Sequence, residues 1–217
     1  MNPPIPSYPL RPINGGPLHE ERPKRGLWAY EPKVNGWRAI LHTPTRRMWN
    51  RHGKRLSIEH EFSTVLEQIR KANLPPELEW LNCEAFERRH ALGKGSLVLL
   101  DYIPTDNATY VERQRRIHRQ FYGVMAQLMS HHAPPPENSL LLLDKYSLNQ
   151  EETEAGFHIH PPLDARDMWH ALPHINKKWN AEVFEGLVAK RLDSPYPRQL
   201  RSPNQESPCW VKHRWEF

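Results

Sequence analysis

The segment that most constrains the fold of this 217-residue chain is 27–42, where large and small side chains alternate on both sides of one lysine. Residues 27–30 and 37–42 each have the period of a half-buried strand. The pattern predicts two strands with Lys33 on the turn between them. An amine held rigidly at such a turn is suited to act as a nucleophile. A solvated lysine that enters a turn has the same local pattern, so both interpretations stay open at this point.

Length and composition limit the fold class. A chain of 217 residues suits one domain, and its hydrophobic content of 38% is enough for a core. Nothing resembles a signal peptide or a run of about 18 apolar residues, so a cytoplasmic protein without membrane contact is expected. The net charge of +5 permits a polyanionic partner without requiring one. Cys83 and Cys209 form neither a disulfide framework nor a metal quartet and are expected to be structural.

The order of the predicted elements favours an α+β fold of antiparallel sheets flanked by helices. Residues 1–25 are rich in proline and are expected to form a surface arm, so that the domain proper spans 26–217. The second predicted helix carries several arginines, Arg113 among them, largely on its solvent side. Besides the strands around Lys33, strands are predicted at 80–86, 97–103, 140–143, 183–191 and 210–215, and helices at 58–71, 109–131 and 164–180.

Charged residues interrupt several of these apolar strands. Glu84 and Asp101 each lie in an apolar run, where a carboxylate needs a partner, a metal ion or a solvent-lined cleft. An acid at the rim of a strand is the alternative, above all for Asp101. Lys212 and Arg214 alternate onto one face of the last strand. Two such cations repel each other unless an anion lies between them.

These charged residues suit the attack of a lysine on the α-phosphate of a nucleotide. The amine must be unprotonated, and neighbouring cations and a bound metal lower its pKa. Carboxylates are needed to hold that metal, and further cations neutralise the phosphates as pyrophosphate leaves. The residues that supply these groups are Lys33, Glu84, Glu185, Lys190, Lys212 and Arg214.

From about Trp28 to Arg214, the chain resembles the nucleotidyltransferase (adenylation) domain of ATP-dependent DNA ligases. These belong to the superfamily that also holds RNA ligases and mRNA capping enzymes. The family's signatures occur in order: residues 31–38 resemble E-x-K-x-D-G-x-R, 51–53 R-x-G, 81–84 D-G-E, 98–101 the strand of the adenine-stacking residue, 184–190 E-G-x-x-x-K, and 210–214 W-x-K-x-K.

The resemblance implies an ATP-grasp-like domain with a nucleotide cleft, which uses ATP and magnesium or manganese. Lys33 would be adenylated, pass AMP to a 5′-phosphate, and so allow a 3′-OH to seal the nick. Glu84 and Glu185 are the implied metal contacts. The expected ATP-binding residues are Glu31, Lys33, Asn35, Arg38, Arg51, Glu84, Leu100, Lys190, Lys212 and Arg214, and the expected nucleic-acid contacts are Arg51, Lys54, Arg198 and Arg201.

Several positions depart from the family pattern. Asn35 replaces the usual Asp, Asn82 and Cys83 replace Asp-Gly, and Arg214 replaces Lys. Because the lysine and the acids are retained, activity is expected. Leu100 stands where an aromatic ring commonly stacks on adenine, so either an aliphatic wall or Tyr102, predicted on the same strand face, is expected there.

DNA ligases of this family continue into an OB-fold domain, whereas this chain stops at Phe217, so a nucleotidyltransferase domain without an OB fold is expected. Nicked duplex DNA is the expected substrate. With few phosphate contacts, binding should be weak and sensitive to salt, and a partner protein is expected to supply a clamp in trans. Two alternatives are an RNA ligase, which tolerates Asn35 more readily, and a domain that binds nucleotide or nucleic acid with weak or no catalysis.

Overall fold

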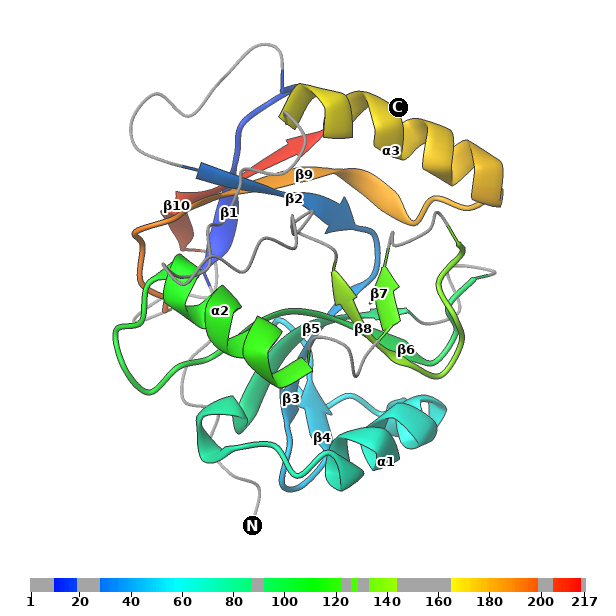
Figure 1. Ribbon diagram of the computed structural model, residues 1–217, viewed down its shortest axis with the longest axis vertical. Coiled ribbons are helices and arrows are strands. Elements are labelled where there is room, and N and C mark those ends of the chain that lie inside the picture. Colours follow the sequence, from blue (N-terminus) through cyan, green and yellow to red (C-terminus); the bar gives the residue numbers. More distant parts are fainter. Residues whose placement is uncertain are drawn as a thin grey trace, which may run out of the picture.

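The computed structural model describes residues 10–18, 28–86, 92–121, 126–128, 133–143, 165–198 and 205–215. They form a mixed α+β fold with two sheets and few helices, and the sheets lie one above the other (Figure 1). The four-stranded sheet has the order β1 (Arg11–Asn14), β10 (Glu206–Arg214), β9 (Phe184–Arg191) and β2 (Trp28–Val34). The six-stranded sheet has the order β4 (Arg47–Trp49), β3 (Trp37–His42), β5 (Trp80–Phe86), β6 (Ser96–Tyr102), β8 (Leu140–Leu143) and β7 (Ala126–Leu128).

Helices cover the outer sides of the two sheets. Helix α3 (Ala165–Trp179) lies along the four-stranded sheet, α1 (Ser63–Lys71) lies beneath the six-stranded sheet, and α2 (Tyr110–Phe121) packs beside β6 (Figure 1). Two short 3₁₀ helices, η1 (Glu59–Phe62) and η2 (Pro76–Leu78), flank α1. None of the described helices is long and apolar enough to cross a membrane.

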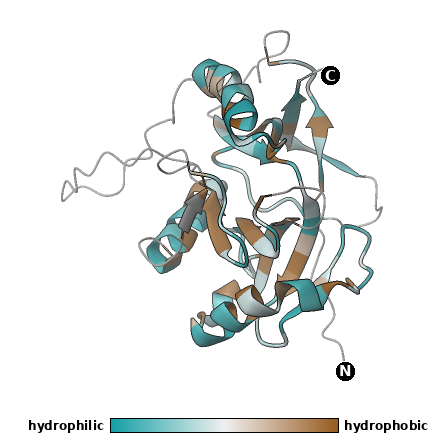
Figure 2. Cartoon of the chain, turned by 90° about the vertical axis from the view of Figure 1, so that its right-hand side faces the viewer, coloured by the Kyte–Doolittle hydropathy of each residue, from teal (hydrophilic) through white to brown (hydrophobic). Residues whose placement is uncertain are grey.

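Three apolar clusters hold these layers together, and Figure 2 shows the hydrophobic strands lying between more hydrophilic helices. The first packs α1 against the six-stranded sheet, with Leu66 and Leu81 among its buried members. The second packs α3 against β2 and β9 and continues to Val98 on the opposite face of the six-stranded sheet. The third joins the two sheets directly, because Trp210 of β10 packs with Ile40 of β3. Residues on the facing sides of the sheets are therefore brought together.

The predicted hairpin around Lys33 is wrong. Strand β2 pairs with β9, whereas β3 pairs with β4 and β5, so the link Asn35–Gly36 passes from one sheet to the other. Lys33 lies inside β2, near its end, rather than on a turn. Side-chain alternation marks a strand but does not select its partner, which long-range packing decides. The sheets are also mixed rather than purely antiparallel, since β1 with β10, β6 with β8 and β7 with β8 are parallel pairs.

Two further segments differ from the sequence interpretation. The helix predicted over 109–131 ends at Phe121, and 126–128 forms β7. Part of the N-terminal arm, Arg11–Asn14, is a strand of the four-stranded sheet. The arm therefore contributes backbone hydrogen bonds to the sheet that carries Lys33.

Candidate active site between the two sheets

Lys33 and Glu185 form an ion pair on the inner side of the four-stranded sheet. The Lys33 ammonium donates a hydrogen bond to Glu185 Oε1 on the neighbouring strand β9. The same oxygen accepts a hydrogen bond from Arg214 Nη2 on β10 at 3.2 Å. The side chains of Lys33 and Glu185 are 17% and 20% exposed, and that of Arg214 is 51% exposed. Because solvent reaches all three groups, a charged ligand can compete for these pairs.

Gly186 lets the strand that carries Arg214 approach Glu185. Its φ is +142°, and a Cβ atom at this position would lie only 1.9 Å from the backbone oxygen of His213. No side chain fits there without moving β10. Glycine is therefore required at position 186 for steric reasons. The close approach of the two strands brings Arg214 to the carboxylate of Glu185.

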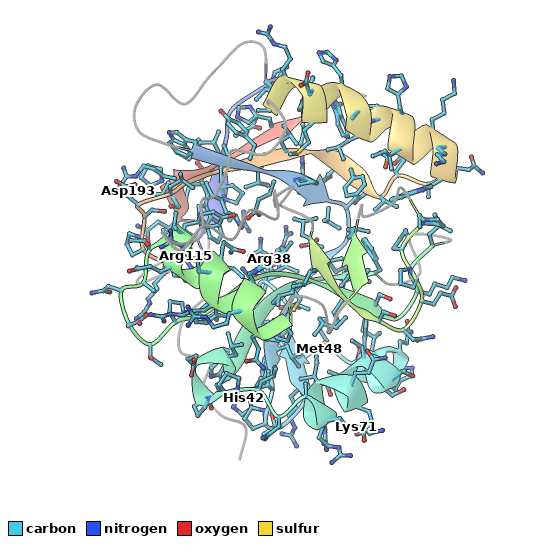
Figure 3. The ribbon with its side chains drawn as sticks, in the orientation of Figure 1. Arg38, His42, Met48, Lys71, Arg115 and Asp193 are labelled. Carbon is cyan, nitrogen blue, oxygen red and sulfur yellow. The ribbon has the colours of Figure 1, made fainter. Side chains whose placement is uncertain are left out.

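The six-stranded sheet contributes Arg38 and Glu84 from the opposite side (Figure 3 labels Arg38 in the space between the sheets). Arg38 Nε lies 3.9 Å from Glu84 Oε2, and the Glu84 side chain is 13% exposed. Burial raises the pKa of Glu84, the charges of Arg38 and Lys33 oppose that rise, and Glu185 adds to it. Glu84 is thus within electrostatic reach of the Lys33–Glu185 pair.

The link between the two sheets is fixed at both of its residues. The amide of Gly36 hydrogen-bonds to the Glu84 carboxylate, and a Cβ atom on Gly36 would lie 2.8 Å from Glu84 Cγ. The side-chain Nδ2 of Asn35 donates to the backbone oxygen of Glu182 at 3.1 Å. The backbone N–H of Asn35 donates to the backbone oxygen of Val183 at 2.9 Å. The motif residues Asn35 and Gly36 therefore hold the end of β2 against both β5 and the start of β9.

Lys212 is a further cation of this site. Its pKa is lowered by burial first, and then by the charges of Arg214 and Lys33. Its ammonium is therefore held less favourably than that of a lysine in water. A phosphate bound among Lys33, Lys212 and Arg214 would relieve this repulsion, which is the arrangement expected of a polyphosphate site.

Glu31 and Lys190, also predicted nucleotide contacts, form a separate, closed cluster. Lys190 Nζ lies 2.8 Å from Glu31 Oε2, and their side chains are only 4% and 3% exposed. The Tyr110 hydroxyl donates to the other Glu31 oxygen. The Lys190 ammonium also lies 5.5 Å from the ring centre of Tyr110 and 4.8 Å from that of Trp210. The ion pair between Glu31 and Lys190 therefore joins β2 to β9.

A β-bulge separates the two residues proposed to lie against adenine. Asp101 is opposite Asn82 but Leu99 is opposite Cys83, so Leu100 is an extra residue in β6. An extra residue reverses the alternation of side chains. Leu100 consequently packs on the cluster away from α1, whereas Tyr102 is fully buried in the core on the α1 side. The expectation that Tyr102 shares the face of Leu100 is wrong.

Of the basic residues expected to contact nucleic acid, Arg51, Lys54 and Arg198 lie on segments that connect strands. Arg51 and Lys54 are exposed on the turn that follows β4. Arg198 Nη2 donates to the backbone oxygen of Pro104, which ties the segment after β9 to the loop after β6. Arg201 lies outside the described residues.

Sequence reasoning missed the buried ion pair of Asp101 and Arg113. Arg113 Nε lies 3.0 Å from Asp101 Oδ1 and 3.2 Å from Oδ2, and both side chains are fully buried. The arginine was expected on the solvent side of its helix, so that expectation is wrong. An acid inside an apolar strand signalled the need for a cation, but the helix offers several arginines.

The two acids of the site fit a divalent cation that arrives with a phosphate ligand. No group of three or more His, Cys, Asp or Glu side chains within the described residues is placed to hold a metal alone. Mg²⁺ usually keeps several waters and binds through one or two carboxylates together with substrate phosphates. Glu84 and Glu185 can supply those carboxylates, since the charge of Glu185 is close enough to raise the pKa of Glu84.

Sequence comparison finds no matching protein family and no matching curated protein. Structure comparison does find similar folds: the ligase domain of M. tuberculosis LigD has a TM-score of 0.51 and 17% identity over 96% of this chain and 59% of that chain. The fold is shared with DNA ligase domains. A mycobacterial DNA ligase D complexed with ATP and MES has a TM-score of 0.51 and 16% identity over 96% of this chain and 60% of that chain. A protein described as Pmar-Lig_Pre has a TM-score of 0.53 and 15% identity over 97% of this chain and 47% of that chain. The chain thus spans under two thirds of these ligase structures.

Proposed function

We propose that this chain is an ATP-dependent, DNA-ligase-like nucleotidyltransferase with Lys33 as its nucleophile. The observation that carries the proposal is the meeting of Lys33, Glu185 and Arg214 from one sheet with Arg38 and Glu84 from the other. The site is open to solvent and rich in cations, as binding of a polyphosphate requires. The fold shared with DNA ligase domains, one of them in complex with ATP, supports the same function.

In the proposed first step, Lys33 Nζ bonds to the α-phosphorus of ATP. The bond between that phosphorus and the bridging oxygen to the β-phosphate breaks, and pyrophosphate leaves. Before attack the ammonium loses a proton through its hydrogen bond to Glu185. Arg38, Lys212 and Arg214 balance the charge of the phosphates. Glu84 and Glu185 would hold a divalent metal ion, which stabilises negative charge on phosphate oxygens when bound.

The later steps pass the adenylate to nucleic acid. The 5′-phosphate of a nicked strand attacks the phosphorus of the lysine adduct, which forms a new phosphoanhydride and frees Lys33. The adjacent 3′-OH then attacks the 5′-phosphate, so that a phosphodiester bond forms and AMP leaves. Each step replaces one bond to phosphorus with another.

Covalent labelling with α-³²P-ATP and magnesium tests the first step. The wild-type chain should retain label on a denaturing gel, and Lys33→Arg should retain none, because the guanidinium keeps the charge but is not a nucleophile. Lys54→Arg, on the exposed turn after β4, is the matched control and should label normally. Label on Lys33→Arg would show that another residue is the nucleophile.

An RNA ligase is the second candidate, favoured by the uncharged Asn35 whose side chain is bound to the Glu182 backbone. Single-turnover joining on a nicked DNA duplex and on a nicked RNA duplex distinguishes the two. Faster joining of RNA would identify RNA as the substrate in place of DNA, and the proposed chemistry at Lys33 would be unchanged. A chain that binds ATP but never becomes labelled would be a binding domain.

A further inference from the structure

Residues 11–16, which the proposed function does not use, pack directly on the strand that carries Lys212 and Arg214. They include β1, which pairs in parallel with β10 on the edge that β9 leaves open (Figure 1). Asn14 lies opposite Lys212, and the backbone N–H of Gly15 donates to the backbone oxygen of Lys212 at 3.0 Å. Strand β10 is therefore held from both edges where it carries the cations of the site.

The same segment also covers the back of β10. Side chains alternate along a strand, so Val211 and His213 point away from the face that carries the two cations. A Cβ atom on Gly15 would lie 2.4 Å from Val211 Cγ1 and 2.9 Å from His213 Cε1. Gly15 is itself buried. Only a residue without a side chain lets the segment lie this close to β10.

His213 joins the segment through a hydrogen bond. Its side chain is fully buried, and its Nδ1 lies 3.1 Å from the backbone oxygen of Gly16. A carbonyl oxygen only accepts, so Nδ1 carries the proton and donates. Gly16 has a φ of +64°, a left-handed conformation that glycine adopts readily. The hydrogen bond therefore ties the segment to the residue that lies between Lys212 and Arg214 in the sequence.

Lys212 depends on the backbone for its position. Arg214 is oriented by its hydrogen bond to Glu185. No described residue forms a hydrogen bond with the Lys212 ammonium, and most of the charges that act on it are positive. A long, flexible side chain loses conformational freedom when it binds an anion. A strand that is fixed from both edges lowers this cost, because it holds the base of the side chain in place.

We propose that residues 11–16 are a positioning element of the nucleotide site, which holds β10 so that Lys212 and Arg214 together contact the phosphates of a nucleoside triphosphate. The segment acts through β10 rather than by contact with the ligand. The identity of the anion rests on the proposed function. The dependence of the two cations on the segment follows from the backbone pairing, the close approach of Gly15 and the hydrogen bond to Gly16.

The test is the binding of inorganic tripolyphosphate to the full chain, measured by titration calorimetry. Gly15→Ala should bind it about tenfold more weakly, the loss expected for one charge-assisted hydrogen bond, because the methyl group forces β10 or the segment to move. Adding Val211→Ala removes the atom nearest to that methyl group and should recover part of the affinity. Ile69→Val, in the cluster under α1, is the control, which should lower the thermal midpoint and leave the affinity unchanged.

Two variants of His213 test the second contact without adding bulk to the segment. His213→Leu removes the donor to Gly16 and should weaken the binding of tripolyphosphate. His213→Asn keeps a donor near the position of Nδ1 and should bind more tightly than His213→Leu. If the segment only supported the fold, both variants would have lower thermal midpoints and wild-type affinity.

Wild-type affinity for tripolyphosphate in Gly15→Ala would overturn the inference, and so would a loss that Val211→Ala does not reverse in part. Covalent labelling with ATP separates this outcome from the proposed function, because binding of tripolyphosphate needs no nucleophile. A chain that never becomes labelled but loses tripolyphosphate affinity in Gly15→Ala would overturn the ligase proposal and support the positioning role. A chain that becomes labelled but binds tripolyphosphate equally well after Gly15→Ala would do the reverse.

Discussion

Two charged clusters lie two residues apart on β2, and their surroundings differ sharply. The Glu31–Lys190 pair is 3% and 4% exposed and is enclosed by the rings of Tyr110 and Trp210. The Lys33–Glu185 pair is 17% and 20% exposed and is shared with Arg214. Aromatic cover therefore separates charges that hold the sheet together from charges that can exchange partners with a ligand.

The difference has an energetic meaning. Removing one partner of a buried ion pair leaves an unbalanced charge in the interior, which costs about 3–5 kcal/mol. Removing one partner of an accessible pair costs about 1 kcal/mol or less, since water solvates the remaining charge.

The largest effect is expected at Arg113, whose partner Asp101 is fully buried. Arg113→Met should lower the free energy of unfolding by about 3–5 kcal/mol, measured by urea denaturation. Arg119→Met, at an exposed position on the same helix, is the matched control and should change stability by about 0.5 kcal/mol at most. A loss below about 1 kcal/mol at Arg113 would mean that full burial does not set the energy of these pairs.

The next largest effect on stability is expected at Lys190, and the same change at Lys33 should have a smaller one. Lys190→Met should cost about 3 kcal/mol, whereas Lys33→Met should cost less than about 1 kcal/mol. Combining Lys190→Met with Glu31→Gln should recover part of the loss, because both charges are then absent. Urea denaturation of the wild type, Lys190→Met, Glu31→Gln and their combination measures the coupling between the two charges. Equal losses for the two lysines would remove the distinction between a closed and an open cluster.

A smaller effect is expected from the pH dependence of Glu84. Its pKa in the fold is raised above the ordinary value of 4.5, chiefly by burial. The ionised carboxylate therefore destabilises the fold at neutral pH, and this effect disappears as pH falls below 4.5. Glu84→Gln should be more stable than wild type at pH 7 and equal to it near pH 4, as seen in thermal midpoints at both values. A midpoint difference that does not change with pH would contradict the raised pKa.

The smallest effect is expected at Leu100, on the bulge of β6. Leu100→Phe should strengthen ATP binding about twofold, because an aromatic ring adds roughly 0.5 kcal/mol of stacking on adenine. Titration calorimetry with ATP measures the change. Tyr102→Phe is the comparison, and it should leave ATP affinity unaltered, since its ring lies in the core on the other side of the sheet. If Tyr102→Phe changed the affinity for ATP and Leu100→Phe did not, adenine would have to bind on the opposite face of the sheet.

Local sequence patterns predicted much of this structure. Alternation located the strands around Lys33, and helical spacing placed Val65, Leu66 and Ile69 on the buried face of α1. The motif order singled out Lys33 and Glu185, which the fold brings together across 152 positions of sequence. These features depend on spacing that a single segment carries.

Long-range features could not be predicted in the same way. The partners of β2 and β3 depend on which sheets form elsewhere in the chain. The bulge at Leu100 adds one residue without any local signal, and it turned Tyr102 to the other face. The choice of Arg113 over its neighbours as partner of Asp101 depends on how α2 is rotated against β6. Each of these is decided by packing between distant segments.

The order of the strands along the chain has a consequence for biosynthesis. Strands β3 to β8 all belong to the six-stranded sheet and follow one another without interruption, whereas the other sheet combines strands that precede and follow them. During translation the six-stranded sheet can therefore form first, and Lys33 must wait for β9 and β10 to leave the ribosome. We expect the nascent chain to be inert toward nucleotide until Glu185 and Arg214 have been synthesised, so that catalytic competence arises at the last stage of folding.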